Sequence, residues 1–160
     1  MRKERIRMIV REGSLVMQHV IRYESVTPHK DWYLPILGLR ANLVNEDIYY
    51  TSPVAFKIEE IEGKEDVGKY TYYIALNTQV EVPETSHFEQ EEFLAIGPAI
   101  YVRCSETEEL DDAYELLERY AKEKDWELEP VYYHVSFDLF DDVIIDVYAV
   151  VKGADFETWS

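Results

Sequence analysis

The sequence predicts an α+β domain of duplicated β-α-β-β units, because strand-like and helix-like segments occur twice in the same order. The two sets keep a nearly constant spacing: the first strands begin at about residues 14 and 91, and the last strands at 69 and 143. Each unit alone would expose one face of a small sheet, and pairing the two around a pseudo-twofold axis would bury both faces. We therefore expect an antiparallel sheet with two main helices and a ligand cleft between repeats at about 14–80 and 91–152.

The first half is predicted to contain a strand, a helix and two further strands. Gly13–Thr27 alternates and is rich in β-forming residues, which is typical of a strand. Apolar residues recur at helical spacing over Asp31–Asn45, with the first residue as the expected N-cap. The segments Ser52–Ile61 and Lys69–Val80 have strand character, and the charged loop of residues 62–68 between them, with two glycines, suits a hairpin.

The strands of the second half follow the same plan. Glu91–Cys104 is rich in strand-forming residues, and Gly97-Pro98 within it indicates a bulge or an edge position. Pro130–Phe140 and Val143–Lys152 are the second and third strands, separated by a turn of two aspartates.

The helix of the second half is predicted from its first turn and its apolar stripe. Ser105–Glu108 has the spacing of a capping box, and basic residues gather toward the end of the helix near Lys124. Its apolar positions recur with helical periodicity and are Leu110, Tyr114, Leu117 and Ala121.

Length and composition predict one domain over residues 1–160, because 160 residues with 47% hydrophobic content can bury a core and no linker divides them. The single cysteine, Cys104, can form neither an internal disulfide nor a cysteine metal cluster, which fits a reducing compartment. No apolar run approaches a membrane span of about 20 residues, and the N-terminus has no signal-peptide pattern. We expect a cytoplasmic protein.

The charge excludes some classes of partner. Sixteen Lys and Arg against thirty-three Asp and Glu give a formal net charge of -17, which repels phosphate backbones and anionic membranes. The expected partner is therefore a small molecule or another protein, and neither nucleic acid nor a membrane. The oligomeric state is left open.

Catalytic and metal-binding patterns are weak. The four histidines are far apart and none has a metal-ligand spacing, so we expect no metal site and no cofactor. Cys104 lies just before a predicted helix N-terminus, where a thiol can become nucleophilic, although a small buried side chain is the commoner role. No catalytic residue is predicted, and the sequence favours a binding protein over an enzyme.

The last third of the chain carries a resemblance to a known family. The helix ends before Trp126, and the strand segments Pro130–Val135 and Ile145–Lys152 follow. In this order the chain resembles the GyrI-like superfamily of bacterial effector-binding domains, whose second repeat closes with segments of the form Tyr-Glu-x-Tyr and Asp-Ile-Tyr-x-Pro-Val. The topology covers most of the chain. The resemblance implies a stand-alone protein that binds a small molecule, since no DNA-binding domain precedes the unit.

One departure from the family pattern concerns the ligand site. Members that bind cationic drugs have a buried glutamate on the strand that here holds Tyr133 and His134. Asp146 is the alternative acid, and aligning the two halves places Tyr72 opposite it, on a face shared with Tyr148. A carboxylate among tyrosines suits a cationic or aromatic ligand. The same pattern is compatible with Asp146 facing solvent on an amphipathic strand.

The candidate ligand-binding residues are Asp146, Tyr148, Tyr72, Tyr133, His134, Glu92 and Trp126. Two alternatives to small-molecule binding stay open. One is an acidic protein-interaction module, such as a DNA mimic or an accessory to a secreted toxin. The other is a small-molecule hydrolase like one branch of the resembling family, with Asp146 or Glu92 as base and a pocket tyrosine.

Overall fold

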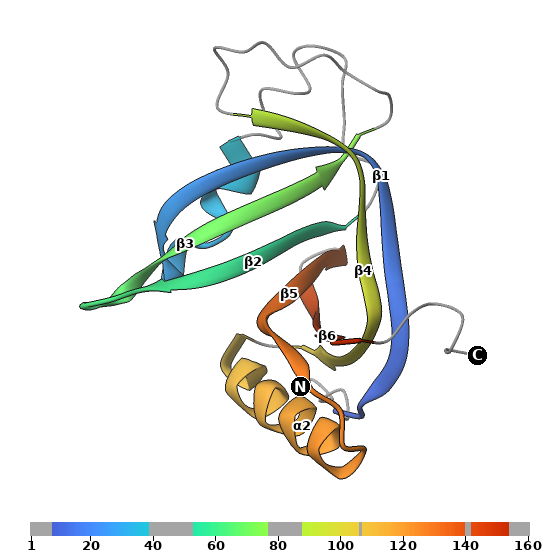
Figure 1. Ribbon diagram of the computed structural model, residues 1–160. Coiled ribbons are helices and arrows are strands. Elements are labelled where there is room, and N and C mark those ends of the chain that lie inside the picture. The colour runs from blue at the N-terminus through green and yellow to red at the C-terminus, as the bar shows by residue number, and fades with distance from the viewer. Residues whose placement is uncertain (1–7, 39–52, 77–87, 106, 140–141, 154–160) are drawn as a thin grey trace. The chain divides into compact units, whose positions relative to one another are not determined.

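The computed structural model describes residues 8–38, 53–76, 88–105, 107–139 and 142–153 (Figure 1). The chain divides into two compact units: unit 1 contains Met1–Leu15 and Ala95–Ser160, and unit 2 contains Val16–Leu94. Each unit consists mostly of antiparallel sheet with short helical segments, as expected for an α+β chain. Among the described residues, no helix is long and apolar enough to cross a membrane.

The sheet of unit 2 has the strand order β1-β3-β2 (Figure 1). Its strands are β1 (Arg11–Pro28), β2 (Val54–Ile61) and β3 (Lys64–Ala75). The short 3-10 helix η1 (His29–Asp31) and a helical turn at residues 34–38 follow β1. Of these three strands β3 comes last in the sequence, and it is the central strand of the sheet.

Aromatic side chains fill the core of unit 2. The register places Tyr72 of β3 between Tyr23 of β1 and Phe56 of β2, so the three share one face. Tyr70 stacks on Tyr72 with ring centroids 5.9 Å apart, and Trp32 stacks on Phe56 at 5.1 Å. These rings bury the apolar face that a three-stranded sheet needs in order to be stable.

The β2–β3 hairpin is tighter than the sequence predicted. The expected loop of residues 62–68 is a two-residue turn at Glu62 and Gly63, and the strand resumes at Lys64. Gly63 has φ of +80°, a conformation that side chains rarely adopt. One glycine is thus sufficient for the turn. Gly68 lies within β3, where an added Cβ would meet the ring of His29 and the side chain of Ile58.

The sheet of unit 1 has the strand order β4-β6-β5, with the last strand again in the centre. Its strands are β4 (Phe88–Cys104), β5 (Leu128–Leu139) and β6 (Asp142–Val151), and the helix α2 (Leu110–Glu123) connects β4 to β5. The first residues of β4 belong to unit 2, as the first residues of β1 belong to unit 1. The strands predicted in the second half are confirmed to within two residues at their described ends, apart from an earlier start of β4.

The start of α2 differs from the predicted capping box. A 3-10 turn, η2 (Thr107–Glu109), precedes the helix, and the acid that satisfies Ser105 is Glu109, one residue later than expected. Its Oε1 accepts hydrogen bonds from the Ser105 backbone N–H at 3.0 Å and from the Ser105 hydroxyl at 2.8 Å. The accepting acid lies one residue later than in a capping box because the 3-10 turn η2 separates Ser105 from the first residue of α2.

The predicted helix of the first half is described only in part. Helical residues begin at 34, because Asp31 closes the 3-10 turn η1 and does not cap the helix as expected. The remainder of that helix and the predicted end of the third strand, residues 77–80, lie outside the described residues. The two units share a strand order, with the last of their three strands in the centre of each sheet.

Candidate functional site

The two faces of the unit 1 sheet differ in what covers them. Side chains alternate along β6, and Ile145, Val147 and Ala149 share one buried face. The helix α2 contacts β6, and its Tyr114 hydroxyl lies 2.6 Å from Nε2 of His134, the cross-strand partner of Val147. Asp146 and Tyr148 therefore lie on the face opposite the helix.

An ion pair forms the centre of that opposite face. Arg103 of β4 lies directly across from Asp146 of β6 in the antiparallel register. The Arg103 Nε donates to Asp146 Oδ1 at 2.8 Å, and Nη2 donates to Oδ2 at 3.0 Å. The Asp146 side chain is 3% exposed and the Arg103 side chain is 49% exposed. The carboxylate thus anchors a guanidinium whose outer side is open.

Two tyrosines lie two residues away from this pair, on the same strands and the same face. Tyr101 and Tyr148 are cross-strand partners whose rings stack with centroids 4.8 Å apart and an interplanar angle of 21°. Burial, followed by the charge of Asp146, raises the pKa of Tyr148 to about 12. Its phenol is therefore protonated at neutral pH and is able to donate a hydrogen bond.

Strand β5 is the third strand that contributes side chains to this face. Tyr133 lies across from Tyr148, Val135 from Asp146, and Phe137 from Ile144. The Phe137 ring centroid is 5.7 Å from Arg103 Cζ, close enough for a cation–π contact. We call Tyr101, Arg103, Tyr133, Phe137, Asp146 and Tyr148 the tyrosine–arginine face of unit 1.

Arg103 is the residue of this face that the sequence analysis missed. It is the only charged residue between Phe93 and Cys104, a strand otherwise made of apolar and small residues. That isolation is the signal that could have marked it. Asp146 was predicted, but its partner depends on the β4–β6 register, which joins residues 43 positions apart.

His134 and Trp126 belong to the helix side of unit 1. His134 is 2% exposed, and its Nε2 lies 2.6 Å from the hydroxyl of Tyr114 on α2. The backbone N–H of Trp126 donates to the carbonyl of Ala121 at 2.8 Å, and its ring packs 6.1 Å from that of Tyr120. Both residues fasten α2 to the chain that follows it.

Tyr72 and Glu92 belong to unit 2. Tyr72 is 1% exposed, and its hydroxyl donates to the backbone carbonyl of Trp32 at 2.6 Å. Burial is the main cause that raises its pKa. Glu92 lies in β4, and its side chain is outside what the structure describes. Tyr72 thus has a core role in its own unit.

A second polar group in unit 2 lies beside that core. His29 Nδ1 is 2.8 Å from the Tyr70 hydroxyl, and His29 Nε2 is 3.3 Å from Glu60 Oε2. Burial, followed by the charge of Glu60, raises the pKa of Tyr70 to about 12. The histidine links a buried phenol to an exposed carboxylate and fixes η1 against the sheet.

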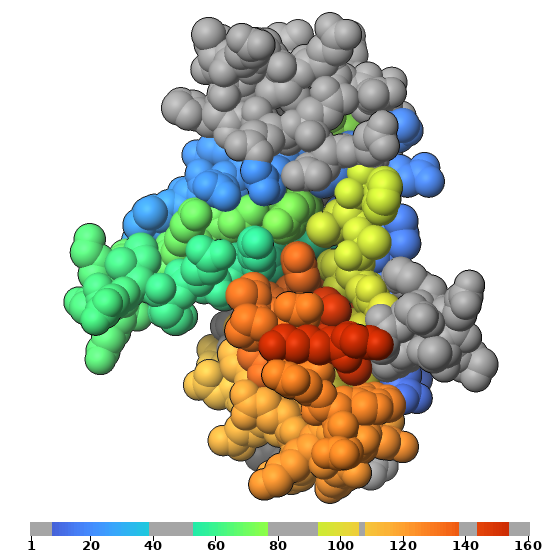
Figure 2. Space-filling view, viewed as in Figure 1, coloured from blue at the N-terminus to red at the C-terminus, as the bar shows by residue number. Residues whose placement is uncertain are grey.

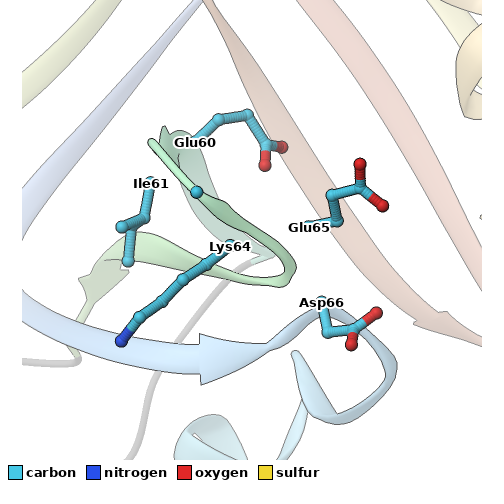
Figure 3. Close-up of a pocket in the computed structure, with 6 residues that line it drawn as sticks. Glu60, Ile61, Lys64, Glu65 and Asp66 are labelled. Atoms are coloured by element: carbon cyan, nitrogen blue, oxygen red, sulfur yellow. The ribbon is translucent and has the colours of Figure 1, made fainter.

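The hollow in Figure 3 lies at the tip of the β2–β3 hairpin. It has a volume of about 580 Å³ and is lined by Glu60, Ile61, Gly63, Lys64, Glu65 and Asp66. Figure 3 shows the Lys64 amine and Ile61 on one side and the carboxylates of Glu65 and Asp66 on the other. The tip is an exposed projection in Figure 2, and it lacks the apolar wall that a ligand pocket needs.

Cys104 is fully buried on the helix side of β4. Burial, with smaller effects of Glu109 and Asp146, raises the pKa of its thiol to about 12, which makes it a poor nucleophile. Of the alternatives for Cys104, the structure supports the small buried side chain. Within the described ranges, no group of three or more histidine, cysteine or acidic residues could hold a metal ion.

Comparison with solved structures identifies the kind of fold. The chain is similar to the crystal structure of the EcmrR C-terminal domain, with a TM-score of 0.65 and 14% identity over 92% of this chain and 98% of that one. It matches equally well EcmrR in a cryo-EM structure of an EcmrR–DNA complex, where it corresponds to 58% of the EcmrR chain. No protein-family model and no curated protein matches the sequence. The chain thus shares the fold of the EcmrR C-terminal domain.

Proposed function

We propose that this chain is an effector-binding domain that takes up a small aromatic molecule on the tyrosine–arginine face of unit 1. The observation that carries the proposal is the Tyr101–Tyr148 stack beside the half-exposed guanidinium of Arg103. A flat ring can extend such a stack, and the polar group beside it can orient the ligand.

The fold supports this proposal. The matched part of EcmrR is its C-terminal domain, and the chain resembles the GyrI-like effector-binding superfamily in Pro130–Val135 and Ile145–Lys152. We further propose that the β1-β3-β2 and β4-β6-β5 sheets arose by duplication of one β-α-β-β unit, because the last strand is central in both. The DNA complex belongs to EcmrR, and the net charge of -17 argues against a DNA contact by this chain.

The ion pair changes what is expected of Asp146. In the sequence analysis this carboxylate was the candidate partner of a ligand cation. In the structure both of its oxygens accept hydrogen bonds from Arg103. A ligand cation would have to displace a guanidinium held by two hydrogen bonds, so we propose an aromatic ligand rather than a cationic one. For the same reason Asp146 is poorly placed to serve as the base of a hydrolase.

Calorimetric titration with a flat neutral probe, naphthylmethanol, tests this function. We expect saturable binding, and the substitution Tyr101→Leu should weaken it about tenfold, or ~1.4 kcal/mol, by removing the more exposed ring of the stack. Tyr132→Leu is the matched control, because Tyr132 stacks on Tyr114 at a similar 4.7 Å on the helix side. Absence of binding by the wild type, or equal losses in both variants, would refute the proposal and favour the protein-interaction alternative.

A further inference from the structure

We infer that the ligand of the tyrosine–arginine face carries an anionic group, such as a carboxylate or sulfonate, that accepts hydrogen bonds from Arg103. This inference rests on the proposed function and specifies the chemical class of its ligand. The inferred ligand is anionic, whereas Asp146 taken alone in the sequence suggested a cationic ligand.

Arg103 has more hydrogen-bond donors than Asp146 uses. A guanidinium has five N–H groups, and Asp146 accepts from one on Nε and one on Nη2. Among the residues that the structure describes, Asp146 is the acceptor of Arg103, which leaves three N–H groups for a second acceptor. Because the Asp146 hydrogen bonds raise the pKa of Arg103 above its ordinary value, the charge is permanent.

The ion pair has its positive group toward solvent. Asp146 is the buried end, with a side chain 3% exposed, and Arg103 is the open end at 49%. A ligand that reaches this face therefore meets the positive end first. Two parallel hydrogen bonds to Asp146 and the ring of Phe137 restrict the guanidinium, so little side-chain entropy remains to be lost on binding.

The tyrosines beside Arg103 add no competing charge to this face. Tyr148 is 6% exposed, and its phenol is protonated and neutral at neutral pH. The aromatic rings of Tyr101 and Tyr148 provide the apolar contact. A ring that carries an acceptor anion fits both properties, whereas an ammonium group would oppose the charge of Arg103.

The total charge of the chain opposes this preference only at long range. At about 0.15 M salt the Debye length is about 8 Å, so exposed acidic side chains farther than this from Arg103 are largely screened there. A contact with Arg103 at hydrogen-bond distance is screened far less. We therefore expect the local charge to decide the preference at physiological ionic strength.

The test uses three probes with one ring system and different charge: naphthoate, naphthylmethanol and naphthylmethylammonium. For the wild-type protein in 0.15 M salt, naphthoate should bind about tenfold more tightly than naphthylmethanol, and the ammonium probe should bind most weakly. The double variant Arg103→Met/Asp146→Leu removes the pair without leaving a buried charge. It should bind naphthoate and naphthylmethanol within about twofold of each other.

The outcomes separate this inference from the function on which it rests. If naphthylmethanol binds but naphthoate is not preferred, the inference fails and the aromatic site stands. If no probe binds, the proposed function itself fails. Tightest binding of the ammonium probe, lost in Asp146→Asn, would show that Asp146 releases Arg103 for a ligand cation. A naphthoate preference that persists in the double variant would likewise overturn the role of Arg103.

Discussion

Removing either partner of the Arg103–Asp146 pair should destabilise the protein by unequal amounts. The two side chains carry opposite unit charges and differ in burial, since Asp146 is 3% exposed and Arg103 is 49% exposed. Loss of Arg103 strands a carboxylate inside the sheet. Loss of Asp146 leaves a guanidinium that water can hydrate.

The exposures set the expected magnitudes. Arg103→Met should lower the free energy of unfolding by about 3 kcal/mol, near the lower end for a broken buried pair because water reaches the arginine side. Asp146→Asn should cost about 1 kcal/mol, the usual effect of a weakened hydrogen bond. The double variant Arg103→Met/Asp146→Leu should lie within about 1 kcal/mol of the wild type, since apolar replacements of such pairs are often neutral.

Urea denaturation followed by circular dichroism measures these differences. With an m-value of about 2 kcal/mol per molar, the midpoints of Arg103→Met and Asp146→Asn should fall by about 1.5 M and 0.5 M. Equal shifts in the two single variants would mean that the carboxylate is hydrated and that the ion pair has no buried end. A double variant as unstable as Arg103→Met would contradict the stranded charge as the cause.

The remaining predictions concern Cys104, Gly97 and Glu109. Burial raises the pKa of the Cys104 thiol from 9.0 to about 12, so about one thiol in ten thousand is ionised at pH 8. Dithionitrobenzoate should therefore modify the folded protein far more slowly than the urea-unfolded chain. Because this folded pKa is raised, thiol burial stabilises the fold below pH 9, and that stabilisation should disappear as the pH rises toward 12 in a denaturation series. Gly97→Ala should cost about 2 kcal/mol or more in thermal unfolding, because Gly97 has φ of +141° and a Cβ there would press on Ser14; an unchanged melting temperature would refute this. Glu109→Ala should cost about 1 kcal/mol by removing the acceptor of two hydrogen bonds, whereas the exposed Glu108→Ala should cost less than about 0.5 kcal/mol in the same urea assay.

The strands were predictable because their signal is local. Alternation and β-forming residues mark Gly13–Thr27 and Val143–Lys152 in the sequence, and the structure has strands at both. The errors lie at turns, where one residue changes the outcome. Gly63 alone is sufficient for the hairpin, and Glu109 replaces the acid expected one residue earlier.

The candidate site was predictable only in part, because it depends on pairing between distant strands. Asp146 and Tyr148 could be placed on one face by their spacing along β6. Arg103 could be placed beside them only from the β4–β6 register, and that register makes a guanidinium the exposed charged group of this face. His134 lies next to Tyr133 in the sequence, yet it points to α2, since neighbours in a strand face opposite sides.

The central position of β3 and β6 has a consequence for the protein as it is synthesised. The strands β4 and β5 both pair with β6, which is complete only after the ribosome has passed residue 151. In the same way, β1 and β2 can pair with β3 only after β3 has been synthesised. At 5–20 residues per second, the stretch from the end of β4 to the end of β6 occupies the ribosome for seconds. During that time the open strand edges are available to other nascent chains and to chaperones. A message truncated before β6 would therefore yield a product that exposes two unpaired edges, which quality-control proteases can recognise.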